Sequence, residues 1–157
     1  MFESLLSKKH RDIRIKQCLQ LSEASNCPRR KVGALLIDPV RNVILMDGYN
    51  GGPRNGSKLC GDNCCLRTEQ NIVSGTQIQI GCHHAEMNVI CNAAANGVKT
   101  EGAWLIVNCE CCLMCSKLIH HAGIKKVITI ADTYKTNEGI LYLKSNGILV
   151  EKVEENI

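Results

Sequence analysis

The sequence predicts an α/β layer fold in which helices cover both faces of one sheet. Its 157 residues fit one domain, and we expect that domain to span residues 1–157. Apolar residues make up 45% of the chain and charged residues 22%, which is typical of a globular protein and excludes disorder, collagen and coiled coil. Segments of strand character alternate with helical segments, which favours a layered α/β arrangement.

The N-terminal part contains one predicted helix and two predicted strands. Residues 3–24 have loosely helical apolar spacing and predict the helix. The apolar run 32–37 predicts a buried strand, and 43–49 its hairpin partner, with 39–42 as the turn. Residues 50–82, rich in Gly, Asn, Ser and Cys, predict a cysteine-bearing insertion loop that is functional or is held by something other than an apolar core.

Helices and strands alternate through the C-terminal part. Asn96-Gly97 is typical of a helix end, and Gly123 marks another. We predict helices over 85–95, 112–122 and 137–146, and strands over 103–108, 124–131 and 147–153.

Charge and composition limit the classes of function. The net charge of +4 suits an anionic small molecule, and with only 3% aromatic residues it argues against nucleic acid as a partner. No apolar run approaches the roughly 20 residues that span a bilayer, and the first residues do not resemble a secretory signal. We therefore expect a cytoplasmic protein without a membrane partner. In that compartment its 11 cysteines predict metal binding or thiol chemistry rather than disulfides.

Two short motifs together predict a catalytic zinc site. His84-x-Glu86 is followed by Cys112-x-x-Cys115, and imidazole and thiolate are both zinc ligands. A C-x-x-C pair can reach one metal from a single helical turn, and a helix N-terminus favours thiolate. Ligation by His84, Cys112 and Cys115 leaves one tetrahedral position for water, and Glu86 beside it is suited to carry protons.

Two geometric points stay open in the sequence. Positions 84 and 86 do not share one face of a regular helix, so both reach the metal only if His84 lies at the helix entrance. Cys109-x-x-Cys112 also competes with Cys112-x-x-Cys115. We prefer the second pair because residues 108–111 are expected to form the loop after the strand.

The combined pattern matches the general zinc deaminase signature, H-x-E followed by P-C-x-x-C. Cys111 stands where that signature has proline. A thioredoxin-like redox pair is the alternative interpretation of the C-x-x-C motif, but it leaves His84-x-Glu86 unexplained.

From about residue 10 to residue 150 the sequence resembles the deoxycytidylate deaminases of the cytidine deaminase superfamily. Four segments carry the resemblance: 25–34, 48–53, 84–88, and 112–115 continuing into 122–125. The resemblance implies a three-layer α/β/α fold with a five-stranded mixed sheet, often assembled as a homohexamer. It also implies hydrolysis of dCMP to dUMP and ammonia in pyrimidine deoxynucleotide metabolism.

The motif residues take defined roles in such a reaction. Zinc lowers the pKa of its bound water and makes hydroxide available near neutral pH. Glu86 takes the water proton and passes it to the ring N3. It then protonates the leaving amine, acting first as base and afterwards as acid.

Candidate substrate contacts lie near the first two strands and in one later segment. By resemblance, Asn50 binds the sugar hydroxyl and Tyr134 lies near the phosphate. Arg30 and Lys31, just before the first strand, are candidates to hold the 5′-phosphate. The alternatives are a turn role for Asn50 and a solvated charged surface for Arg30 and Lys31.

The remaining cysteines imply, by the same resemblance, a second and structural zinc that holds the insertion. Its ligands would be Cys27, Cys60 and Cys82, with Cys65 as the fourth. Cys64 and His83 are rivals for places in that set, and free thiols are the alternative. A closed four-ligand site would order a polar loop without apolar burial. Cys18 and Cys91 are expected to be core thiols.

Related deaminases are switched by deoxynucleoside triphosphates, so dCTP or dTTP with Mg²⁺ is a candidate effector. Gly48, Tyr49 and Gly51 resemble part of that effector site, although the glycines can equally serve only the turn. The rival reactions are deamination of dCTP or another cytosine nucleotide, of free cytidine, and of adenosine in tRNA. A zinc-ribbon binding module is the alternative without catalysis.

Overall fold

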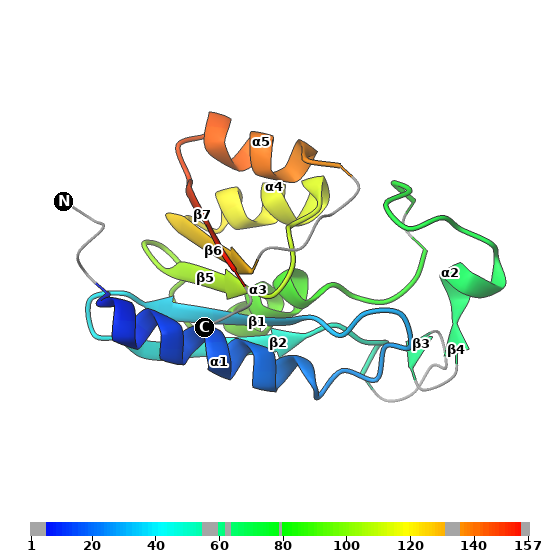
Figure 1. Cartoon of the computed structure of the whole chain (residues 1–157), viewed down its shortest axis with the longest axis horizontal. Coiled ribbons are helices and arrows are strands. Elements are labelled where there is room, and N and C mark those ends of the chain that lie inside the picture. The colour runs from blue at the N-terminus through cyan, green and yellow to red at the C-terminus, as the bar shows by residue number, and fades with distance from the viewer. Residues whose placement is uncertain (1–5, 55–59, 62–63, 79, 131–135, 155–157) are drawn as a thin grey trace.

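A five-stranded mixed sheet forms the centre of the molecule (Figure 1). The computed structural model describes residues 6–54, 60–61, 64–78, 80–130 and 136–154. The strands follow the order β2-β1-β5-β6-β7, in agreement with the sheet implied by the resemblance. Their bounds are β1 Gly33–Asp38, β2 Val43–Tyr49, β5 Trp104–Val107, β6 Lys126–Ile130 and β7 Leu149–Val153.

The first two strands form the predicted hairpin. They pair antiparallel from Gly33 opposite Tyr49 to Asp38 opposite Val43, with a register shift between Leu36 and Ile37. The Asp38 carboxylate accepts hydrogen bonds from the turn amides of Val40 and Arg41, and Asn42 adopts φ 54°, a conformation that asparagine tolerates better than most residues.

The other half of the sheet is parallel. β1 pairs antiparallel with β5, while β5–β6 and β6–β7 are parallel pairs. Parallel neighbours need crossover connections, which α4 (Leu113–His121) and α5 (Glu138–Ser145) provide. The carboxyl end of β5 therefore leads directly to the N-terminus of α4, where the Cys112-x-x-Cys115 motif lies.

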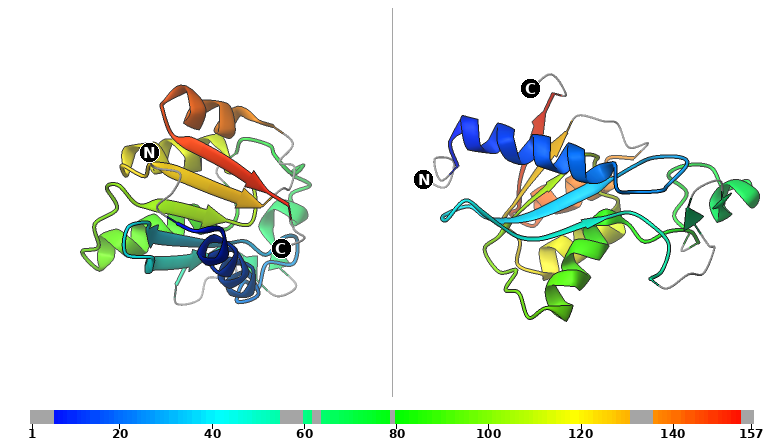
Figure 2. Two further views of the ribbon diagram at one scale, coloured as in Figure 1. Left: turned by 60° about the vertical axis from the view of Figure 1, so that its left-hand side comes forward. Right: turned by 90° about the horizontal axis from the view of Figure 1, so that it is seen from below.

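Helices cover both faces of the sheet, as predicted (Figure 2). On one face, α1 (Lys8–Ser22) packs Ile15 and Cys18 against Leu35 and other strand residues. On the other, α3 (Ala85–Ala95), α4 and α5 pack against the alternate positions of the same strands. Successive side chains of β1 point to opposite faces of the sheet, and those of residues 34–37 are all buried, so this one strand packs against both helical layers.

The insertion has more structure than its composition predicts. Within residues 50–82 the chain forms β3 (Cys60–Gly61) paired with β4 (Cys64–Cys65), followed by α2 (Leu66–Glu69). Elements of two to four residues are too short for a periodic apolar pattern, so the sequence does not reveal them.

Of the two cysteines predicted to be core thiols, one is buried and the prediction for the other is wrong. Cys18 is fully buried between α1 and β1, where its thiol donates to the carbonyl of Gly33. Cys91 is exposed instead, because it lies on the side of α3 that faces away from the sheet. Within the described residues, every helix is too short or too polar to cross a membrane.

Candidate active site

The three predicted zinc ligands lie at the starts of two helices. His84 immediately precedes α3 with extended backbone (φ −72°, ψ 151°), so it lies at the helix entrance, as the spacing of positions 84 and 86 requires. Cys112 precedes α4 in the same way (φ −70°, ψ 165°), and Cys115 lies in its first turn. Both segments therefore approach the site with helix N-termini.

The donor atoms have the separations that one zinc ion requires. His84 Nδ1 lies 3.5 Å from both Cys112 Sγ and Cys115 Sγ, and all three donor atoms lie within 4.8 Å of one another. Bonds of about 2.0 Å to nitrogen and about 2.3 Å to sulfur at tetrahedral angles put the two atoms about 3.5 Å apart. The residues present therefore fit zinc. The structure brings Cys112 and Cys115 into this set and leaves Cys109 outside it.

Hydrogen bonding prepares this set for a cation. The Cys115 thiol and the His84 ring donate to Cys112 and lower the pKa of the Cys112 thiol. The same contact with Cys112 raises the pKa of His84, and donation to Cys112 raises that of Cys115. The backbone N–H of Cys115 also donates to Cys112 Sγ, at 3.4 Å. These contacts favour the thiolate form of Cys112, which is the form that binds a metal.

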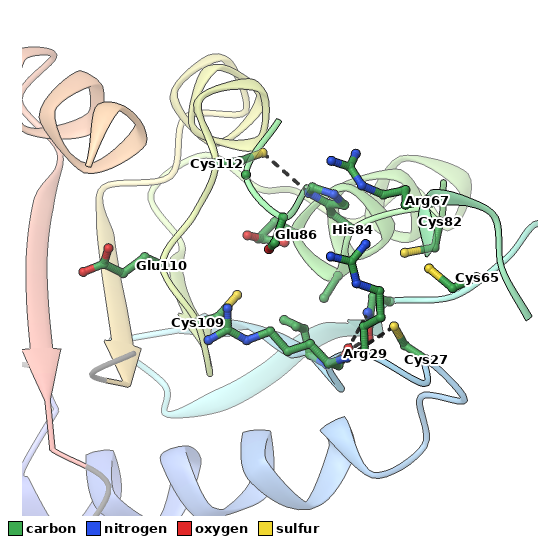
Figure 3. Close-up of a pocket in the computed structure, with 16 residues that line it drawn as sticks. Cys27, Arg29, Cys65, Arg67, Cys82, His84, Glu86, Cys109, Glu110 and Cys112 are labelled. Atoms are coloured by element: carbon green, nitrogen blue, oxygen red, sulfur yellow. Dashed lines mark hydrogen bonds between the residues drawn. The ribbon is translucent and has the colours of Figure 1, made fainter. Parts of the chain in front are cut away.

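Glu86 lies in the first turn of α3 beside this set. Its side chain is buried, with 2% of the residue exposed. Burial raises the pKa of the carboxyl, and the neighbouring His84 opposes that shift. Figure 3 shows its carboxylate close to the His84 ring, inside the pocket. A buried carboxylate beside a three-donor metal set is suited to general acid–base chemistry.

A single pocket connects the metal set with the insertion (Figure 3). Its walls come from the segment before β1, the end of β2, the insertion and the loop before α4. The lining residues include Cys27, Arg29, Arg30, Asn50, Cys65, Arg67, Ser74, Cys82, His84, Glu86, Cys109, Glu110 and Cys112.

Three arginines line this pocket, and only Arg30 was singled out from the sequence. Arg29 is its neighbour, and nothing in the sequence distinguishes the two. Arg67 comes from α2 and donates to the carbonyls of Thr76 and Ile80, so it holds two parts of the insertion together. No sequence signal indicates Arg67, because its position depends on the insertion's own fold.

Of the other predicted substrate-binding residues, Asn50 lines the pocket, whereas Lys31 does not. Asn50 is buried and lines the pocket. Its amide accepts from the N–H of Val32 and donates to the carbonyl of Arg30, both at 2.8 Å, so it joins β2 to the start of β1. Lys31 is not among the lining residues, and its ammonium contacts Glu23 at 2.9 Å. Tyr134 lies outside the described residues.

The predicted effector segment packs closely against α3. A Cβ at Gly48 would lie 2.7 Å from the backbone nitrogen of Val89, so glycine is required there for packing. The Tyr49 carbonyl accepts from the Asn88 side chain at 2.7 Å. Gly51 pairs with His83 in an isolated bridge.

Three of the four cysteines predicted for the second zinc line the same pocket. Figure 3 shows the sulfurs of Cys27, Cys65 and Cys82 turned toward one another on the side away from Cys112. Hydrogen bonds from the Cys82 thiol and from backbone N–H groups of Arg29 and Arg30 lower the pKa of Cys27 to about 5. These sulfurs are not as tightly grouped as the donors of the first set.

Cys60, the remaining predicted ligand, and the rivals Cys64 and His83 lie in the insertion or directly after it. Cys60 is paired with Cys65 in the β3–β4 register, and its side chain lies outside the described part of the structure. The Cys64 thiol donates to Glu69 at 3.3 Å. His83 exchanges two backbone hydrogen bonds with Gly51.

Comparison with known proteins identifies the family. The model of the cytidine and deoxycytidylate deaminase zinc-binding region matches residues 8–131. This range contains the metal donors, Glu86 and every residue that lines the pocket. The chain belongs to this family of zinc-binding deaminase domains.

Individual relatives agree with the family. The chain is 36% identical to ComE operon protein 2 of Bacillus subtilis over 135 residues, which cover 85% of this chain. It is 37% identical to the deoxycytidylate deaminase of Mus musculus over 119 residues, which cover 74% of it. The chain spans 66% and 62% of the lengths of these two curated relatives.

A solved structure extends the likeness to the fold. The dCMP deaminase of cyanophage S-TIM5, in complex with dCMP and dUMP, superposes with a TM-score of 0.79 at 30% identity. The match covers 94% of this chain and 99% of the phage chain.

Proposed function

We propose that this protein is a zinc-dependent deaminase that hydrolyses dCMP to dUMP and ammonia. One observation carries the proposal. The three donors His84, Cys112 and Cys115 lie beside the buried carboxylate of Glu86, in a pocket that is also lined by arginines. The names of the mouse relative and of the phage structure support dCMP as the substrate.

The roles in the reaction follow from the chemistry of these groups. Zinc, when bound by His84, Cys112 and Cys115, would supply an activated water for attack on the pyrimidine ring. Glu86 accepts one proton from the attacking water and transfers it to ring N3. It then takes the proton of the hydroxyl formed at ring C4 and gives it to the leaving amine, so that ammonia departs. Its burial in the pocket keeps bulk water away from these transfers.

Substrate binding is proposed for the polar walls of the pocket. Arg29, Arg30 and Arg67 supply guanidinium groups, which suit a 5′-phosphate better than a neutral sugar. Asn50 is proposed to contact the sugar hydroxyl, although both polar atoms of its amide already bind backbone groups. Lys31 and Tyr134 stay as weaker candidates for the phosphate.

A second, structural zinc is proposed for the insertion, with Cys27, Cys60, Cys65 and Cys82 as ligands. The arrangement of Cys27, Cys65 and Cys82 around one wall of the pocket supports this set, as does the pairing of Cys60 with Cys65. Donation to Glu69 engages the Cys64 thiol elsewhere and makes it the weaker candidate.

Regulation and assembly are further parts of the proposal. We propose a cytoplasmic homohexamer that responds to dCTP or dTTP with Mg²⁺ near Gly48, Tyr49 and Gly51. The half-exposed Tyr49 side chain is the group there that a nucleotide can reach, since Gly48 packs against α3.

A substrate panel tests the proposal. The purified protein, loaded with zinc, is incubated separately with dCMP, dCTP, cytidine and an RNA carrying the target adenosine, with and without dCTP or dTTP as effector. We expect chromatography to show dUMP from dCMP at the highest rate. Faster turnover of dCTP than of dCMP would show that the substrate is another cytosine nucleotide. No ammonia from any substrate would favour a binding module.

A further inference from the structure

One wall of the pocket comes from the segment that follows α2, residues 71–78. Ser74 and Gly75 of this segment line the same pocket as Glu86 and Cys112. Figure 1 shows α2 and the chain after it extending to one side of the central sheet. The segment therefore borders the catalytic pocket from outside the helices and strands that position the metal donors.

The segment is folded onto α2 as one unit. The guanidinium of Arg67 donates to the carbonyl of Thr76 at 2.9 Å and to those of Ile78 and Ile80 at 3.2 Å. Gly81 leaves room for this side chain, because a Cβ there would lie 2.9 Å from Arg67 Cδ. Since all these contacts lie within the insertion, α2 and the segment can move together without breaking them.

Apolar packing does little to hold this unit against the sheet. Val73 and Ile78 are exposed, and among the described residues neither apolar core contains a residue from 66 to 80. A segment with few buried apolar contacts opens locally at a small cost in free energy. Its position over the pocket therefore depends on polar contacts with the rest of the molecule.

A side-chain hydrogen bond joins the segment to the start of α5. Gln77 Nε2 donates to Glu138 Oε2, and both residues are exposed. This end of α5 is closely packed on the start of α4, because a Cβ at Gly139 would lie 2.7 Å from Ser116 Oγ and 2.9 Å from the carbonyl carbon of Cys112. Glu138 thus belongs to the same packed body as the metal donors, whereas Gln77 belongs to the insertion.

We propose that residues 71–78 form a lid over the pocket and that the Gln77–Glu138 hydrogen bond is its latch, an inference that rests on the proposed deaminase function. The latch breaks to admit dCMP and forms again over the bound nucleotide. Closure keeps bulk water away from the proton transfers of Glu86, and reopening releases dUMP. An exposed hydrogen bond contributes little net free energy, so it can break in every turnover.

A covalent latch tests the lid. Gln77→Cys and Glu138→Cys are combined in a Cys91→Ala background, which removes an exposed native thiol, and the two new thiols are joined by a short bismaleimide. A disulfide is less suitable, because it needs Cβ atoms about 4 Å apart and the glutamine and glutamate side chains span a longer gap. The two single-cysteine variants, treated with the same reagent, are the controls.

The order of addition should give opposite results. If the latch is joined before nucleotide is added, turnover of dCMP should fall about tenfold or more relative to the controls, and dUMP should not bind. If it is joined after dUMP is added, the protein should retain dUMP through gel filtration, whereas the controls release it. Turnover equal to that of the controls, or release of dUMP, would overturn the lid. Failure of the two cysteines to join, checked by mass spectrometry, would contradict the contact itself.

Loss of zinc to a chelator separates this test from that of the proposed function. If the wild-type protein neither deaminates dCMP nor binds dUMP, the proposed function fails, and access to the catalytic metal becomes the test of the lid. Joining the latch should slow the loss of zinc to EDTA about tenfold, because the chelator has to enter through the pocket. An unchanged rate would show that residues 71–78 do not close it.

Discussion

The two cysteine clusters of this molecule share one pocket but are built differently. His84, Cys112 and Cys115 lie at the starts of α3 and α4, which pack on the sheet. Cys27, Cys65 and Cys82 lie on irregular backbone or at the ends of very short elements. The apolar core positions the first cluster before a metal binds, whereas the second has little core around it. We infer that metal is needed for function at the first cluster and for local order at the second.

The largest expected effect distinguishes zinc binding by the three donors from proton transfer by Glu86. Glu86→Gln removes the group that moves protons but none of the three donors. We expect kcat for dCMP to fall by roughly 10³-fold while zinc content is unchanged. Steady-state kinetics and metal analysis on the same preparation measure both quantities. Activity near that of the wild type would show that another group carries the protons.

Two variants, each of which lacks one cysteine ligand, test the difference between the two clusters. Cys112→Ser should remove one zinc per chain and the activity, because one of three donors to the catalytic ion is lost. Cys82→Ser should remove the other zinc and make the insertion sensitive to protease, while part of the activity remains. Metal analysis and limited proteolysis check these outcomes. A wild-type protein with a single zinc per chain would contradict the second site.

A smaller effect is expected at Arg30, whose backbone contacts the second cluster. The backbone N–H of Arg30 donates to Cys27 at 3.5 Å, and its side chain lines the pocket near Cys109. Arg30→Ala should raise KM for dCMP about tenfold through loss of a charged phosphate contact. Lys31→Ala is the matched control and should stay within about twofold. Equal effects of the two would indicate a general charge effect.

The smallest effect concerns thiol reactivity in the metal-free protein. The pKa of Cys27 is lowered to about 5, so this thiol is a thiolate at pH 7, while burial raises that of Cys18 to about 12. After chelation, Cys27 should be alkylated by iodoacetamide well before Cys18, as mass spectrometry can follow. Reloading with zinc should protect Cys27. Equal labelling with and without zinc would mean that Cys27 is not a ligand.

The regular parts of the fold were predictable because their patterns are local. The bounds of β2 and α3 agree with the predicted ranges 43–49 and 85–95, since turn residues and Asn96-Gly97 mark their ends. α1 is shorter than predicted, Lys8–Ser22 rather than 3–24, and residues 1–5 lie outside the described part.

The catalytic motif was predictable because zinc requires specific residue types at specific spacings. The place of Arg67 in the pocket was not, because it depends on how the insertion folds. The environment of Asn50 shows the same limit. Its sequence context is compatible with a turn or a ligand role, and only the fold reveals its contacts with Val32 and Arg30.

The pairing of Gly51 with His83 closes the insertion at its base, directly before the ligand His84. Both backbone hydrogen bonds of this bridge, at 2.8 and 3.2 Å, lie outside the insertion's own hairpin and helix. Because the two ends are held together, a change of length between them adds only a small closure entropy. The insertion can therefore be exchanged for another loop. Such an exchange would change the substrate specificity, while the metal ligands and Glu86 stay the same.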